Sequence, residues 1–64
     1  MIYLTRLNGD KFMLNVDLIE IMEETPDTVI TLTNGKKIVV RDSIRNIKKD
    51  ILKFKRKVFR DLKT

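Results

Sequence analysis

The 64-residue sequence predicts an α+β domain in which a small antiparallel β-sheet of four to five strands precedes one long amphipathic C-terminal helix. Two observations support this class. Short apolar segments with two Asn-Gly turns fill the first 40 residues, as expected for hairpins. From residue 41 the apolar period lengthens to three and four, and no proline or glycine follows. We therefore expect one domain over residues 1–64, with the sheet in 1–40 and the helix in 41–64.

The first hairpin is predicted at the start of the chain. Residues 2–7 (IYLTRL) alternate loosely and are followed by Asn8 and Gly9, a dipeptide typical of hairpin turns. The segment KFML then places Phe12 and Leu14 on one face. Asp10 follows the glycine, so a loop that is one residue longer is the alternative for this hairpin.

A corner and a central strand follow. Residues 15–17 (NVD) break the alternation with short polar side chains that suit a corner. In residues 18–24 (LIEIMEE), alternation places Ile19 and Ile21 on one face. We interpret the glutamates of this strand as a solvated acidic patch, because acid/base catalysis needs a cleft that a short sheet does not offer. They are Glu20, Glu23 and Glu24.

The clearest turn in the sequence lies in the second hairpin. Pro26 and Asp27 close the central strand against residues 28–33 (TVITLT), which are rich in β-branched side chains. Asn34 and Gly35 then predict a type I′ turn with two positive φ angles. Three strands in sequence form a meander, and four side chains of this hairpin are expected to face the core: Ile30, Leu32, Ile38 and Val40.

The C-terminal segment has the pattern of an amphipathic helix. Asp42 or Ser43 can accept a backbone N–H of its first turn. A helix of about 20 residues spans about 30 Å, whereas strands of five or six residues span about 17 to 20 Å. The helix should therefore extend beyond its own sheet. Its apolar face comprises Ile44, Ile47, Ile51, Phe54, Val58 and Leu62, with Leu52 and Phe59 beside them.

The overhanging half of this helix requires another surface to cover its apolar side chains. A domain of this size has a marginal core, and the sequence contains no cysteine to form disulfides. We therefore expect a homo-oligomer, with a monomer whose tail is frayed as the alternative. The expected contact residues are Phe54, Val58, Phe59 and Leu62.

The net charge of +5 is unevenly distributed. Residues 1–40 carry four basic and six acidic side chains, whereas residues 41–64 carry ten basic and three acidic ones, so the two parts have net charges of −2 and +7. Most of the basic residues lie on the helix side opposite the apolar face, and Lys63 belongs to this side. The partner-facing residues we select are Arg45, Lys49, Lys53, Arg56 and Arg60.

Three interpretations of this basic side remain open. It can be a solvated face that keeps the protein soluble, a docking surface for an acidic protein or the anionic cytoplasmic leaflet, or a set of phosphate contacts for nucleic acid. We expect the aromatic side chains to lie in the core, which leaves no exposed platform for stacking bases. These are Tyr3, Phe12, Phe54 and Phe59.

Catalytic and cofactor chemistry is not expected. The sequence has no histidine or cysteine, and its two glycines lie in separate predicted turns rather than in a phosphate-binding loop. We therefore predict no enzyme, no metal site and no cofactor. No apolar run reaches the roughly 20 residues of a membrane span, and the N-terminus lacks the features of a signal peptide. A cytoplasmic protein is expected.

The runs LTRLNG and FMLNVDLIE, followed by IMEETPDTVITLTNGKKIVV and a charged helix, resemble the flagellar FlbD family, which includes swarming motility proteins. The resemblance implies a bacterial accessory protein that supports the flagellar motor and swarming, by an effect on the stator units, at the cytoplasmic face of the inner membrane. It implies no catalytic residues, and it places Leu18, Ile30 and Leu32 in the core. The alternative is a small regulator that binds nucleic acid through the same basic helix.

Overall fold

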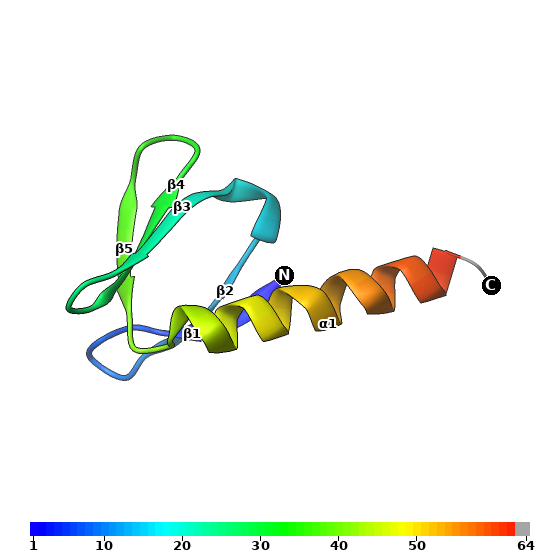
Figure 1. Cartoon of the computed structure of the whole chain (residues 1–64), viewed down its shortest axis with the longest axis horizontal. Helices are drawn as coiled ribbons and strands as arrows, with labels where there is room; N and C mark the ends of the chain where they lie inside the picture. Colours follow the sequence, from blue (N-terminus) through cyan, green and yellow to red (C-terminus); the bar gives the residue numbers. More distant parts are fainter. Residues whose placement is uncertain (63–64) are drawn as a thin grey trace.

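The computed structural model describes residues 1–62, which form five β-strands followed by one long helix (Figure 1). The predicted α+β class is confirmed. The predicted continuation of the helix to Thr64, and the place of Lys63 on its basic side, lie outside the described residues. The elements are β1 (Ile2–Thr5), β2 (Lys11–Leu14), the 3-10 helix η1 (Val16–Leu18), β3 (Ile19–Glu24), β4 (Thr28–Leu32), β5 (Lys37–Val40) and α1 (Ile44–Leu62).

The strands form two antiparallel sheets rather than one. β1 pairs with β2, and β3, β4 and β5 form the predicted meander in that order. An isolated bridge between Arg6 and Val40 joins the two sheets, next to a 2.8 Å hydrogen bond from the Arg41 N–H to the Thr5 carbonyl. The sheets are therefore linked where β1 and β5 end, close to the start of α1.

The second hairpin turns through three residues, so the predicted type I′ turn is wrong. Gly35 has a φ of +85°, and no residue other than glycine has a positive φ in the described chain. The Gly35 N–H donates to the Leu32 carbonyl at 2.9 Å, and the Leu32 N–H donates to the Lys36 carbonyl at 2.8 Å. Asn34 contributes its side chain instead, because its Oδ1 accepts the Lys36 N–H at 3.0 Å. Only the glycine then needs the left-handed conformation.

The first hairpin repeats this geometry. Gly9 has a φ of +96°, its N–H donates to the Arg6 carbonyl at 2.9 Å, and the Arg6 N–H donates to the Asp10 carbonyl at 2.8 Å. The Asn8 Oδ1 accepts the Asp10 N–H at 3.0 Å. The longer loop that the sequence left open is therefore the one formed.

The predicted corner at residues 15–17 is confirmed, and it is the 3-10 helix η1. The Asn15 Oδ1 accepts the Asp17 N–H at 3.0 Å, and the Leu18 N–H donates to the Asn15 carbonyl at 3.0 Å. Leu18 belongs to this helix and its side chain is exposed, so its expected place in the core is wrong.

A β-bulge in β3 overturns the predicted face of this strand. Ile19 lies opposite Leu32, but the register shifts before Ile21, so that Met22 lies opposite Ile30. Ile19 and Met22 pack against the core, whereas Ile21 is 47% exposed. An extra residue on one strand moves every following side chain to the other face, and alternation alone cannot reveal it.

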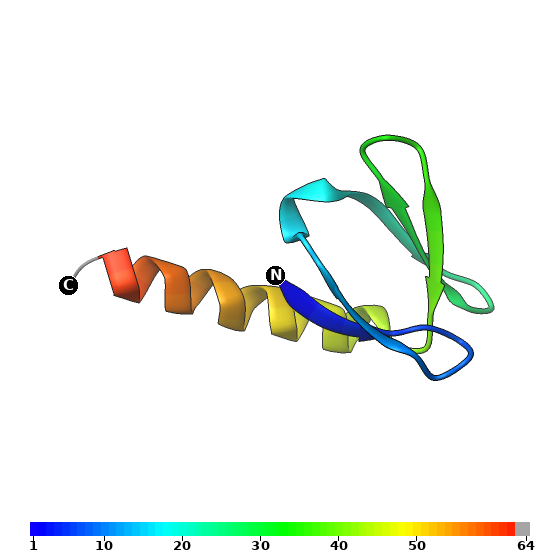
Figure 2. The same cartoon turned by 180° about the vertical axis from the view of Figure 1, so that it is seen from behind.

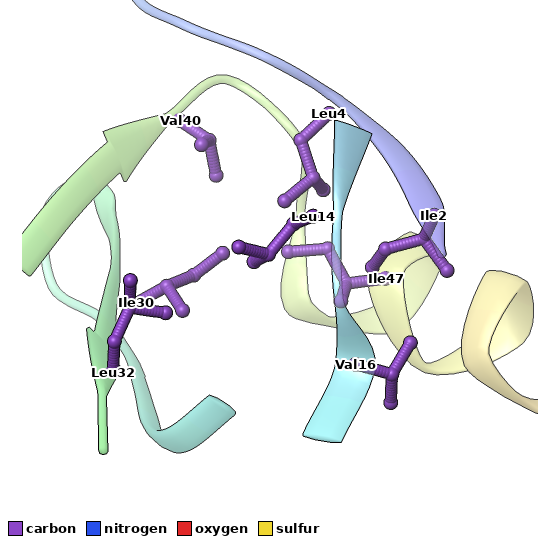
Figure 3. Packing of buried hydrophobic residues seen from close by; sticks show 8 residues of the cluster. All are labelled: Ile2, Leu4, Leu14, Val16, Ile30, Leu32, Val40 and Ile47. Atoms are coloured by element: carbon purple, nitrogen blue, oxygen red, sulfur yellow. The ribbon is translucent and has the colours of Figure 1, made fainter. Parts of the chain in front are cut away.

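The core lies between the three-stranded sheet on one side and the first hairpin with α1 on the other (Figure 3). Figure 3 shows side chains of β4 and β5 pointing toward those of β1, β2 and α1. The second hairpin contributes as predicted, because Ile38 also packs against this cluster. The buried side chains are Ile2, Leu4, Leu14, Val16, Ile30, Leu32, Val40 and Ile47.

Two of the four aromatic side chains are not in the core as expected. Phe12 and Phe54 pack against it, but Tyr3 is 67% exposed and Phe59 is 62% exposed. Tyr3 alternates with the buried Ile2 and Leu4, so it points to the outer face of the first hairpin. Phe59 belongs to the last third of α1, and this end of the helix extends beyond the sheets (Figure 1).

Candidate functional site

Helix α1 has two parts with different surroundings. Residues 44–54, which we call the anchored half, lie beside the sheets, whereas residues 55–62, which we call the tail, extend beyond them (Figures 1 and 2). The longest dimension of the described chain is 41 Å, against 23 and 19 Å for the other two. The predicted overhang of the helix is confirmed.

Two side chains cap the start of α1. The Ser43 Oγ accepts the Asn46 N–H at 3.2 Å, which confirms the predicted cap. The Glu24 Oε1, from the end of β3, accepts the Ile44 N–H at 2.7 Å. A carboxylate also suits the positive end of the helix dipole. The end of β3 is therefore tied directly to the first turn of the helix.

The segment between β5 and α1 holds the first hairpin in place. The Thr5 N–H donates to the Asp42 Oδ2 at 2.7 Å, while the Thr5 carbonyl accepts the Arg41 N–H at 2.8 Å. The Arg41 Nε donates to the Leu7 carbonyl at 2.9 Å. Backbone groups of β1 and its loop are thus satisfied by two consecutive residues, and these bonds fix the direction in which α1 leaves the sheets.

From Ile47 onward, burial of the apolar face decreases toward the end of α1. Ile47 is fully buried, Ile51 and Phe54 are half-buried, and Leu62 is 79% exposed. Of the four residues predicted as oligomer contacts, Phe54 packs against the chain's own core. The other three are exposed on the tail. We call the exposed set Leu52, Val58, Phe59 and Leu62 the apolar stripe.

The five basic residues predicted to face a partner are all exposed, and they follow the helix from its first turn to its last. Within residues 44–62, eight basic side chains outnumber two acidic ones, Asp50 and Asp61. Spacings of three and four residues keep the five on one broad side, away from Ile47. The helix therefore presents positive charge along its whole length, and this charge continues onto the tail. The five residues are Arg45, Lys49, Lys53, Arg56 and Arg60.

Residues 1–62 contain no pocket and no group of three or more histidine, cysteine, aspartate or glutamate side chains placed to hold a metal ion. In the same residues, no helix combines the length and the apolarity needed to cross a membrane. We take the exposed surface of α1 as the candidate site because the five basic side chains and the apolar stripe lie on it.

Sequence reasoning missed the structural roles of Glu24 and Asp42. The local pattern places Glu24 in a solvated patch and Asp42 at a possible helix cap. In the structure, their carboxylates accept hydrogen bonds from backbone N–H groups that are 20 and 37 residues away along the chain. No local pattern signals such contacts. The exposure of Tyr3 could be predicted from the sequence. Its neighbours Ile2 and Leu4 are apolar, and alternation along a strand places Tyr3 on the opposite face.

Comparison with known proteins identifies the family. A family model described as "FlbD: Flagellar and Swarming motility proteins" matches residues 1–59, which include both hairpins and most of α1. Neither the curated proteins nor the solved structures include a significant match. The family match covers more than nine-tenths of the chain, and it agrees with the resemblance carried by the two turn segments. The chain belongs to the FlbD family of flagellar and swarming motility proteins.

Proposed function

We propose that the protein is a non-enzymatic accessory of the flagellar motor, which acts in the cytoplasm by binding another protein through the basic side of α1. The family match supports a role in flagellar and swarming motility. The observation that carries the mode of action is the line of five exposed basic side chains on a helix that projects from the domain.

The chemistry of this side favours an acidic partner surface. Side chains that are held along a rigid helix meet a complementary surface with less loss of entropy than side chains on a flexible loop. Complementary charge also speeds association and sets orientation. A stator or another motor protein at the cytoplasmic face of the inner membrane, near the flagellar base, is the partner we propose.

Charge reversal tests this proposal. We expect the triple variant Arg45→Glu, Lys49→Glu and Lys53→Glu to lose swarming in cells that carry no other copy. All three side chains are exposed, so the fold should be retained, as circular dichroism can check. Swarming at the wild-type level in this variant would show that the basic side is only solvated.

A matched control uses three exposed lysines of the hairpins. Lys11→Glu, Lys36→Glu and Lys37→Glu change the net charge by the same amount, but they lie on the hairpins and not on α1. We expect this variant to swarm normally. A photo-crosslinking residue at position 53, with position 36 as the control, would then capture the partner in motile cells for identification by mass spectrometry.

Nucleic acid binding through the same helix is the second candidate. The exposed ring of Phe59 favours it, because an aromatic side chain beside basic residues can stack on a base. A steep loss of affinity for duplex DNA or RNA as the salt concentration rises from about 50 mM would support this function. If neither duplex DNA nor RNA binds at about 50 mM salt, the nucleic-acid function is wrong and the protein-binding function is retained.

A further inference from the structure

We infer that a second copy of the chain covers the apolar stripe of α1, in an antiparallel dimer formed by the two tails. Leu62 and Phe59, at 79% and 62%, are among the most exposed apolar side chains of the described chain, and Leu52 and Val58 are 54% and 41% exposed. The inference goes beyond the proposed function and does not depend on it.

The shape of the molecule selects the kind of occupant. Val58 follows Ile51 by seven residues and Ile47 by eleven, and Leu62 follows Val58 by four, so both lie on the side of α1 that packs on the sheets. The sheets stand on this side beside the anchored half, and the tail passes beyond them (Figures 1 and 2). A flat bilayer that approached these two side chains would meet the sheets first. A narrow element such as a helix would not.

The dimensions fit one further helix. The eight residues of the tail span about 12 Å along the axis, and a helix with its side chains is about 10 to 12 Å wide. When two tails lie side by side in opposite directions, each tip reaches the point where the partner's helix leaves its sheets. Each copy then covers the stripe of the other with the same residues, as in a closed two-fold dimer.

Electrostatics favour the antiparallel over the parallel arrangement. Residues 52–62 carry five basic side chains and one acidic one, so two tails that lie side by side bring like charges together in either direction. The helix dipole distinguishes the two directions, because parallel tails also place two partially negative C-terminal ends together, whereas antiparallel tails hold these ends apart. Most basic side chains lie on the side of α1 opposite Val58 and Leu62, so they point away from the interface.

The interface is small. Four partly exposed side chains per copy cover less than the roughly 800 Å² per partner of a standard protein interface. We therefore expect a dissociation constant in the micromolar range, so the fraction of dimer should change across concentrations that are accessible in solution.

Sedimentation equilibrium of the full chain provides the first test. The mass should rise from 7.6 kDa toward twice that value as concentration increases through the micromolar range. Val58→Gln with Leu62→Gln should keep the mass at 7.6 kDa, because glutamine preserves helix propensity but removes the apolar contact. Leu7→Gln with Leu18→Gln, which alters two exposed leucines outside α1, should dimerise like the wild type.

Disulfide trapping tests the direction, because the chain has no cysteine of its own. In the antiparallel dimer, position 55 of one copy lies near position 62 of the other. Under oxidation with diamide, a mixture of the Lys55→Cys and Leu62→Cys variants should form the mixed disulfide in large excess over either like pair. Like pairs in excess would show parallel tails and overturn the arrangement.

Two results would overturn the second copy as occupant. One is a mass of 7.6 kDa at all concentrations up to the millimolar range. The other is a monomer that floats with vesicles containing phosphatidylglycerol but not with vesicles of phosphatidylcholine alone, and that loses this binding in the Val58→Gln and Leu62→Gln variant. The second result would assign the stripe to an anionic membrane. Neither depends on the swarming test, so this inference and the proposed function can fail separately.

Discussion

The anchored half and the tail of α1 continue one amphipathic pattern, yet their apolar side chains meet different surroundings. Ile47 is fully buried by both sheets, whereas Leu62, on the same helix, is 79% exposed. The pattern therefore specifies which side of a helix needs cover, but it does not specify what covers it. In the anchored half the sheets cover most of the apolar side chains, whereas in the tail Val58 and Leu62 stay 41% and 79% exposed.

The two parts also differ in what holds the helix. Glu24 and Asp42 tie the start of α1 and its preceding turn to the sheets, and Ser43 caps the first turn of the helix itself. The tail of eight residues is too short to be stable as an isolated helix, so in the monomer it depends on propagation from the anchored half. The polar contacts of the first turn therefore support the surface of the tail, which lies about 20 Å away along the helix axis.

Ile47→Ala should have the largest effect on stability, because it removes the buried side chain that packs the anchored half onto the core. We expect a loss of about 2–5 kcal/mol in the free energy of unfolding, since the side chain is fully buried and its removal leaves a cavity. Val58→Ala, in the tail, should cost less than about 0.5 kcal/mol in the monomer, as for exposed sites in general. Urea denaturation followed by circular dichroism at low micromolar concentration measures both. Equal losses would contradict the distinction between the two parts.

The sequence was sufficient for the elements and their order, because period and turn chemistry are local signals. The change of period at residue 41 predicted the start of α1, which begins at Ile44 after the Ser43 cap. The Asn-Gly dipeptides located both hairpins, although the loop has three residues. A two-residue and a three-residue loop share the same dipeptide, and tertiary context decides between them.

The errors arose where local pattern and tertiary structure differ. The bulge in β3 reversed the predicted side of Ile21, and η1 took Leu18 out of the strand. The chain divides into two sheets at the corner formed by η1, and no local sequence pattern indicates the angle of this corner. For the site, the exposed charges on α1 were predictable because charged side chains are rarely buried. The contacts of Glu24 and Asp42 were not, because they join distant parts of the chain.

Asp42→Ala should have an intermediate effect. It removes the carboxylate that accepts the Thr5 N–H at 2.7 Å, and the loss of such a bond to a charged group costs about 1–2 kcal/mol at a partly exposed position. Asp42→Asn keeps an acceptor oxygen and should recover most of this loss. Thermal unfolding of the two variants gives the comparison. If both variants unfold at the temperature of the wild type, the bond contributes nothing to the attachment of α1.

Ser43→Ala should lower global stability by about 1 kcal/mol, less than Ile47→Ala does, because it leaves the Asn46 N–H without its cap while Glu24 still accepts the Ile44 N–H. Ser43→Asp should restore the wild-type value.

The informative measurement for the tail in the Ser43→Ala variant is hydrogen exchange of residues 55–62. In dilute solution their protection should fall with that of the anchored half, because the tail is propagated from it. At concentrations that favour the dimer, the tail should regain protection, since each stripe is then covered. Faster exchange of the tail at both concentrations would show that the anchored half alone maintains it.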